Sequence, residues 1–261
     1  MMASVDTCSL CPRLCRHGCP VATGAGREAA VPTVIAGVLY DHKRGLASDD
    51  LATRAATLCT DCGACQEVCH IHEPLPQALR HARAALLTPP ELPPLPAFPA
   101  PGRAVALQSA PGDLAAWCAE RQVIPVTCPN RLGLAALEFP VFERRAASLR
   151  ASLLGRSVWT QDGGIAKVLE SAEISFSWCA TDDDAVGSCV CSAGQRPPLA
   201  CCGAGGTLAR HHPDDARRLA HAFARRLPQD AHLLDQRCVR HLQDSGVSVN
   251  GVWGPPLGES S

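Results

Sequence analysis

Cysteine carries most of the chemistry in this sequence, because eight of its 16 cysteines fall in two short runs. The first run contains Cys8, Cys11, Cys15 and Cys19, and a proline follows the last of them. The second run contains Cys59, Cys62, Cys65 and Cys69. Thiolate sulfur is a ligand of both iron–sulfur clusters and zinc. The spacing of the cysteines therefore has to distinguish these two kinds of site.

The spacing favours iron–sulfur clusters. Runs of four cysteines separated by two, two and three residues are typical of bacterial two-cluster ferredoxins. Three closely spaced cysteines on a tight loop can wrap three corners of one cubane, whereas the fourth reaches the neighbouring cluster. We therefore predict two [4Fe–4S] clusters that exchange their fourth ligands. Cluster 1 takes Cys8, Cys11, Cys15 and Cys69, and cluster 2 takes Cys19, Cys59, Cys62 and Cys65.

Zinc is the alternative occupant. A structural zinc site usually gathers two cysteines, a long gap and then two more ligands, whereas each run here supplies four cysteines at once. Two departures from the ferredoxin spacing remove no ligand. Three residues separate Cys11 from Cys15, and His70 follows Cys69 where a proline is usual.

Composition excludes several classes of function. The 261 residues suit one large or two small domains. With 24 Lys and Arg against 25 Asp and Glu, charge gives no reason to expect nucleic-acid binding. Residues 1–6 lack the basic and apolar regions of a signal peptide, and no apolar stretch reaches bilayer length. We expect a cytoplasmic protein with reduced thiols, no transmembrane segment and at most peripheral membrane contact.

Three regions follow from the pattern of the chain. Residues 1–88 carry the clusters, and helices are expected from Ser48 up to Cys59 and over residues 74–87. Helices around the cysteine loops indicate an α-helical dicluster ferredoxin. Residues 89–102 are rich in proline and should form a stiff, extended linker, which we prefer to a proline-motif ligand for a partner.

Residues 103–261 alternate short apolar runs with helical patterns. Helices are expected over residues 113–121, 164–171 and 213–227, and strands over 104–107, 123–126, 157–160, 231–234 and 247–249. This order predicts an α/β domain with an at least partly parallel sheet, and an α+β chain overall. On the helix over 213–227 the apolar side opposes an arginine-rich side. Its arginines are Arg217, Arg218, Arg225 and Arg226.

A second group of metal-ligating side chains lies in this domain. Cys201 and Cys202 are adjacent and precede Gly203, and Cys238 and His241 follow later. The intervening helix would let the chain leave and return to the same sheet edge, so these side chains are expected to converge. Neighbouring thiolates and a neutral imidazole are competent ligands of iron or zinc. A third iron–sulfur cluster, a zinc ion and no metal all stay open for this site.

These motifs resemble those of iron–sulfur proteins with a cysteine-rich CCG domain. That group includes heterodisulfide reductase catalytic subunits and the iron–sulfur subunits of glycolate, lactate and anaerobic glycerol-3-phosphate dehydrogenases. Residues 15–28 are similar to the matching stretch of members that serve amine and betaine oxidation, and residues 201–203 with the gap to Cys238 match the CCG pattern. The resemblance implies an electron-transfer subunit between a flavoprotein dehydrogenase or electron-transfer flavoprotein and a quinone or disulfide acceptor.

The CCG pattern is incomplete in this chain. Gly164 stands where members often carry a cysteine, His241 replaces the last cysteine, and one motif is visible where members typically carry two. A heterodisulfide-reductase-like enzyme with catalytic Cys201, Cys202 and Cys238 is therefore the alternative function. A zinc-dependent interaction or sensor protein is the third. Because the sequence has no flavin, nicotinamide or haem motif, we expect a subunit of an oxidoreductase complex.

The remaining cysteines have simpler interpretations. Cys118, Cys128 and Cys179 lie among apolar residues, where a free cysteine usually acts as a small buried hydrophobe. Cys189 and Cys191 precede Cys201 and are candidates for a substitute ligand.

Overall fold

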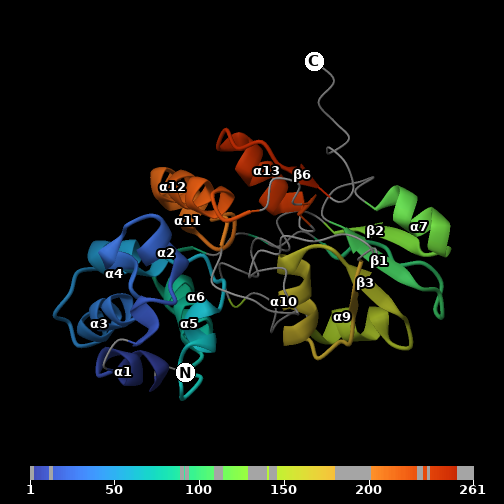
Figure 1. The fold of residues 1–261 in the computed structure, drawn as a ribbon. Helices are drawn as coiled ribbons and strands as arrows, with labels where there is room; N and C mark the ends of the chain where they lie inside the picture. The colour runs from blue at the N-terminus through green and yellow to red at the C-terminus, as the bar shows by residue number, and fades with distance from the viewer. Residues whose placement is uncertain are drawn as a thin grey trace.

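The structure is a computed structural model, in which two helical parts lie together beside a unit with a four-stranded parallel sheet (Figure 1). It describes residues 3–11, 14–88, 91, 94–108, 114–128, 140, 146–179, 201–227, 232–233 and 236–251. Helices together with this small sheet confirm the expected α+β class.

The N-terminal part is helical throughout, as expected from the patterns around its cysteine runs. In chain order its elements are α1 (Ala3–Ser9), η1 (Leu14–Arg16), α2 (Pro20–Gly24), η2 (Glu28–Ala30), α3 (Pro32–Lys43), α4 (Asp49–Thr57), α5 (Ala64–Glu67) and α6 (Leu75–Leu86). Local signals set several of these ends. The Ser48 side chain accepts a hydrogen bond from the Leu51 amide and caps α4, and prolines stand at the start of α2, α3 and α6.

The sheet occupies the middle of the chain. Its strands are β1 (Val105–Gln108), β2 (Ile124–Thr127), β3 (Val158–Thr160) and β4 (Ser177–Trp178), all parallel in the order β2-β1-β3-β4. The helices of this part are α7 (Ala115–Arg121), α9 (Ala146–Leu153) and α10 (Gly163–Ser171). Alternate residues of β1 face different cores, since Val105 and Leu107 pack with α9 and α10 while Ala106 packs with α7. The expected parallel α/β arrangement is therefore present.

A second helical part follows the sheet. It contains α11 (Leu208–His211), α12 (Pro213–Ala224), β5 (His232–Leu233), α13 (Gln236–Asp244) and β6 (Asn250–Gly251), with β5 and β6 paired in parallel. The expected strand over residues 247–249 is wrong by a few positions. Gly246 takes φ +80°, and the Val247 amide bonds to the Leu242 carbonyl at 2.9 Å, which closes α13 with a Schellman-type cap. The helix end therefore uses the segment that the apolar pattern assigned to a strand.

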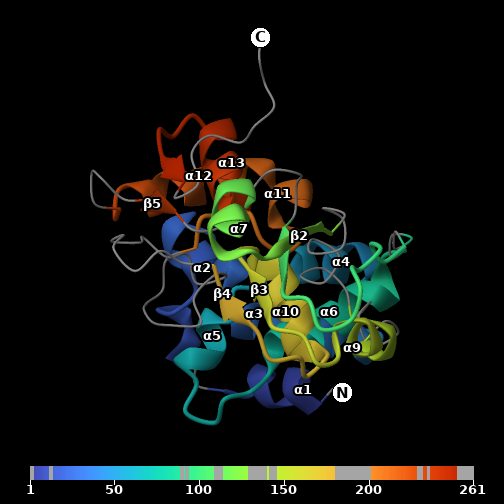
Figure 2. The same cartoon turned by 90° about the vertical axis from the view of Figure 1, so that its right-hand side faces the viewer.

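This second helical part packs on the N-terminal helices (Figures 1 and 2). Side chains of α2, α3, α4 and α6 share one buried core with residues 201–242. A Cβ at Gly24 of α2 would lie 2.7 Å from Leu219 of α12, and Arg27 Nε lies 3.3 Å from the Asp215 carboxylate. The sheet keeps two cores of its own.

The described part of the proline-rich segment runs without regular structure along the sheet unit. Leu95 and Phe98 pack against the core of that unit. The Arg156 guanidinium donates to the carbonyls of Pro99 at 2.6 Å and Ala100 at 2.9 Å. The segment is thus fastened to the sheet side of the molecule.

Candidate iron–sulfur sites

The second cysteine run lies on a tight loop between α4 and α6. Asp61 and Gly63 both take left-handed backbone conformations, with φ +58° and +79°. The Asp61 amide donates a hydrogen bond to Cys59 Sγ at 3.2 Å. These turns let Cys59, Cys62 and Cys65 face one point.

One cavity collects the four cysteines that we assigned to cluster 2, including Cys19 from the first run. It is lined by Cys19, Cys59, Cys62 and Cys65. Most of the remaining wall is apolar and comes from Val21, Ala30, Ile35, Leu75 and Leu79, together with three prolines. Such a wall excludes water from whatever the thiols hold.

A second cavity collects the cysteines that we assigned to cluster 1, including Cys69 from the second run. It is lined by Cys8, Cys11, Cys15 and Cys69. Thr33, His70 and Glu73 contribute to its wall. Pro32, Cys65 and Leu75 line both cavities, so the two sites are neighbours.

One thiol from each cavity shows how burial opposes the thiolate form. Burial, reinforced by Glu73 and by neighbouring cysteines, raises the pKa of Cys8 to about 12. Burial also raises the pKa of Cys19 to about 12, with Cys62 and Cys59 adding to the effect. Four crowded thiolates in an apolar cavity need a positively charged centre, and an iron–sulfur cluster supplies one. No two of the cysteines that the structure describes are joined by a disulfide.

The geometry does not suit a single metal ion. Four thiolates around one zinc, each about 2.3 Å away, must lie within about 4 Å of one another. Among the described residues, no group of three or more His, Cys, Asp or Glu side chains is arranged to hold one ion. A cubane cluster is larger than an ion and keeps its ligands farther apart, so the donor sets fit the cluster better than zinc.

The C-terminal cysteines lie in the core that is shared with the N-terminal helices. Cys201 and Cys202 precede α11, Cys238 lies in α13, and all three are 0–1% exposed. A Cβ at Gly203 would lie 3.2 Å from His241 Nε2, so this histidine stands beside the paired cysteines.

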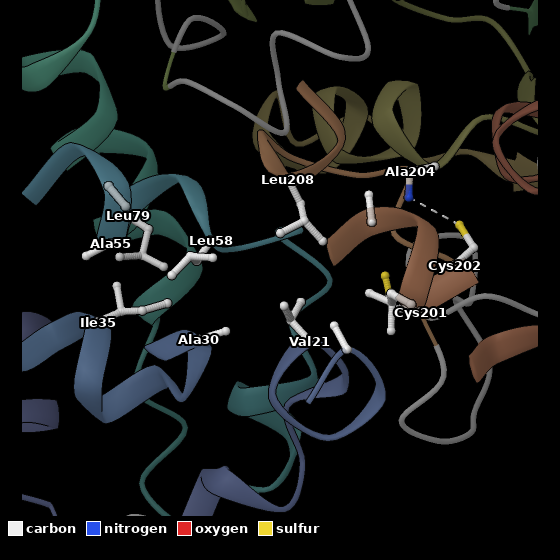
Figure 3. Packing of buried hydrophobic residues seen from close by; sticks show 14 of the residues in the cluster. Val21, Ala30, Ile35, Ala55, Leu58, Leu79, Cys201, Cys202, Ala204 and Leu208 are labelled. Carbon is white, nitrogen blue, oxygen red and sulfur yellow. Dashed lines mark hydrogen bonds between the residues drawn. The ribbon is translucent and has the colours of Figure 1, made fainter. Parts of the chain in front are cut away.

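The expected sheet edge is not where the structure places these cysteines: all three belong to one core with the N-terminal helices, because the apolar face of α12 packs on those helices. Leu208 lies between Leu58 and the Cys201–Cys202 segment (Figure 3). Cys201 Sγ lies 3.5 Å from the hydroxyl of Thr60, the neighbour of Cys59. Sequence reasoning missed Thr60, because nothing in the chain pairs it with a residue 141 positions away.

The other candidate residues are placed as follows. Cys118, Cys128 and Cys179 are buried, as predicted. Cys189 and Cys191 lie outside the described residues, and Gly164 lies within α10.

Comparison with known proteins supports the N-terminal assignment. Residues 4–72, which contain both cysteine runs, match the family model of a 4Fe-4S dicluster domain. Neither the curated proteins nor the solved structures gave a match. The chain is therefore an iron–sulfur protein with an N-terminal dicluster ferredoxin domain.

Within the described part of the chain, every helix is too short or too polar to cross a lipid bilayer.

Proposed function

We propose that this chain binds two [4Fe–4S] clusters and relays single electrons within an oxidoreductase complex. The observation that carries the proposal is the exchange of cysteines between the runs. Cys19 lines the cavity of the second run, and Cys69 lines the cavity of the first. This is the ligand exchange expected of a two-cluster ferredoxin. A bound cluster supplies one-electron chemistry, because it gains or loses an electron with little change of shape.

For this function the protein has to hold the two cluster sites next to each other and shield them from water. Cys65, Pro32 and Leu75 form the wall that separates the cavities. The amide of Asp61 donates to Cys59 Sγ, and hydrogen bonds of this kind raise the potential of a cluster.

A separate flavoprotein is the proposed electron donor, and a quinone or disulfide is the proposed acceptor. The sequence carries no flavin, nicotinamide or haem motif, so hydride chemistry belongs to a partner subunit. Three exposed apolar side chains flank the cysteines assigned to cluster 1. They are Leu10, Val68 and Ile71, with exposed fractions of 83%, 36% and 50%. We therefore place the docking surface for this partner beside cluster 1, and the complex in the cytoplasm, where thiols stay reduced.

A heterodisulfide-reductase-like activity is the second candidate. The contact between Cys201 and Thr60 places the paired cysteines beside the loop of cluster 2, which favours it. Against it, Cys201, Cys202 and Cys238 are fully buried, which leaves no access for a bulky disulfide. Replacing Cys202 by serine separates the two candidates. An electron-transfer subunit keeps its electron flow, whereas a disulfide reductase loses that activity with both clusters intact.

The exchange of ligands predicts an unusual result for paired cysteine substitutions. Cys15→Ala should remove cluster 1, and Cys19→Ala should remove cluster 2, although both belong to the same run. The double variant Cys15→Ala/Cys69→Ala should retain half of the iron, because both residues serve one cluster. The double variant Cys15→Ala/Cys19→Ala should retain none. Iron and acid-labile sulfide contents of anaerobically purified protein measure the outcome.

If each run instead held its own cluster, Cys15→Ala/Cys69→Ala would retain no iron and Cys15→Ala/Cys19→Ala would retain half. Cys128→Ala is the control, because Cys128 is a free cysteine that lies in the core of the sheet and lines neither cavity. Its iron content should equal that of the wild type. Iron-free wild-type protein that still transfers electrons would overturn the proposed function.

A further inference from the structure

Arg83 of α6 is a charged side chain in the middle of the apolar core. It is 0% exposed, and its Nε donates to the Ala56 carbonyl at 2.8 Å. Ala56 lies three residues before Cys59, near the end of α4. Burying a guanidinium costs free energy, which apolar packing at this position would avoid. The hydrogen bond to the C-terminal end of α4 gives Arg83 one structural role, and its buried charge can have a second.

The charge of Arg83 acts on the ligand loop of cluster 2. Arg83 follows Leu79, which lines the cavity of cluster 2, by one helical turn, and its guanidinium bonds to the backbone three residues before Cys59. Asp61 carries the opposite charge in the same loop, where its amide donates to Cys59 Sγ. Asp61 lies 3.6 Å from Arg80 Nε, however, so these two side chains together add little net charge. Arg83 thus supplies a buried positive charge behind the loop that carries Cys59.

The cavity of cluster 1 carries a charge of the opposite sign. Glu73 lines that cavity together with Cys8, Cys11, Cys15 and Cys69. A buried arginine therefore lies behind the loop of one site, and a glutamate lines the other.

We propose that Arg83 raises the reduction potential of cluster 2 and that Glu73 lowers that of cluster 1. This inference rests on the proposed cluster function. Reduction adds one electron, supplied by the reduced flavin of the partner, and takes a four-thiolate cluster from a net charge of −2 to −3. No bond or proton is exchanged. A positive charge in a low-dielectric core stabilises the more negative state, and a carboxylate destabilises it. Both effects favour the electron on cluster 2, beside Thr60 and Cys201.

The test is a potentiometric titration of the whole chain, purified anaerobically and followed by electron paramagnetic resonance with dithionite as reductant. A Cys59→Ala variant, which keeps cluster 1, identifies which midpoint belongs to which cluster. Arg83→Met should lower the midpoint of cluster 2 by at least a tenfold change in the reduction equilibrium, about 59 mV for one electron, and leave cluster 1 unchanged. Glu73→Gln should raise the midpoint of cluster 1.

Two further variants separate charge from packing. Arg83→Lys keeps the positive charge and should retain the wild-type midpoint. Arg54→Met removes an exposed arginine of α4 and should move neither midpoint. If the Arg83→Met protein does not hold cluster 2, the titration uses Arg83→Gln as the neutral variant. This variant keeps a hydrogen-bond donor for the Ala56 carbonyl.

An unchanged midpoint of cluster 2 in the neutral variants, or equal shifts of both clusters, would overturn the inference. Failure of both neutral variants to hold cluster 2 would also overturn it, in favour of a purely structural role. Wild-type protein that holds fewer than two clusters would instead refute the proposed function.

Discussion

A single glycine allows the C-terminal part of the chain to touch the ligand loop of cluster 2. Gly206 takes φ +59°, and a Cβ at this position would lie 2.5 Å from the Cys59 carbonyl oxygen. The same Cβ would lie 2.8 Å from the carbonyl carbon of Thr60. The backbone of Gly206 therefore packs directly on the loop, at a distance that no other residue type permits.

Replacing Gly206 by alanine should weaken this contact strongly. Gly246→Ala is the matched control, because Gly246 has φ +80° and a Cβ there would meet no atom of the described residues within 4 Å. In the control the free energy of unfolding should fall by about 1–2 kcal/mol, the cost of a left-handed backbone in a residue with a Cβ. In Gly206→Ala the free energy of unfolding should fall by a further ~1–3 kcal/mol, because the new Cβ overpacks the contact. The free energy of unfolding in urea measures both, and equal losses would show that the contact is not tight.

The sequence could indicate the cysteines of each cavity but not the residues behind them. Spacing alone groups Cys19 with the second run, because a short loop can wrap only three corners of one cluster and leaves its fourth cysteine for the neighbouring cluster. Arg83 follows Leu79 by four residues and shares its helical stripe, yet its charge argued against burial. Its place in the core depends on the carbonyl of Ala56 in another helix, and no local pattern encodes such a partner.

At the scale of elements, α12 packs on α2, and the residues that precede α11 and α12 bond to the last turn of α4. Thr207 Oγ1 donates to the Thr57 carbonyl at 3.1 Å, and His212 Nε2 lies 3.0 Å from Thr57 Oγ1. The apolar and arginine-rich sides of α12 were predicted correctly, since Leu219 is buried and Arg217 is exposed. The sequence did not reveal what the apolar side packs against, because amphipathic periodicity defines a face and not its partner.

This docking should weaken in mild acid. Burial lowers the pKa of His212 below 6.5, and although Asp215 raises it, His211 and two arginines lower it further. The folded state therefore prefers the neutral imidazole, and the unfolded chain takes up the proton first as pH falls. This stabilisation is complete above pH 6.5 and is lost as pH falls through the lowered pKa.

Hydrogen exchange over residues 208–224, corrected for the intrinsic pH dependence, measures this effect between pH 7.5 and 5.5. Protection should fall with pH in the wild type and change less in His212→Gln. His221→Gln alters an exposed histidine of α12 and should behave as the wild type does. An equal fall in protection with pH in all three proteins would exclude His212 as the cause of the pH dependence.

At the scale of the whole molecule, the two ends of the described chain build one core around the cluster sites. Val21, Leu58 and Leu79 of the N-terminal helices share it with Leu208 and Leu219. The sheet lies between these parts in sequence but keeps separate cores. The proline-rich segment is the conspicuous break in the sequence, whereas the packing of residues 201–242 on the first helices becomes visible only in three dimensions.

This shared core predicts that residues 1–88 need residues 201–251 to hold their clusters. A fragment of residues 1–88 would expose side chains such as Val21 and Leu58, whose burial is worth about 1.5–3 kcal/mol each. Joining residues 1–88 to residues 201–251 through a flexible linker should restore the core without the sheet. The fragment alone should bind a hydrophobic dye and lose cluster 2 in air faster than the fusion does. Because cluster 1 lies away from Thr60 and Gly206, its lifetime should differ less between the two proteins, and equal loss of both clusters would contradict this account.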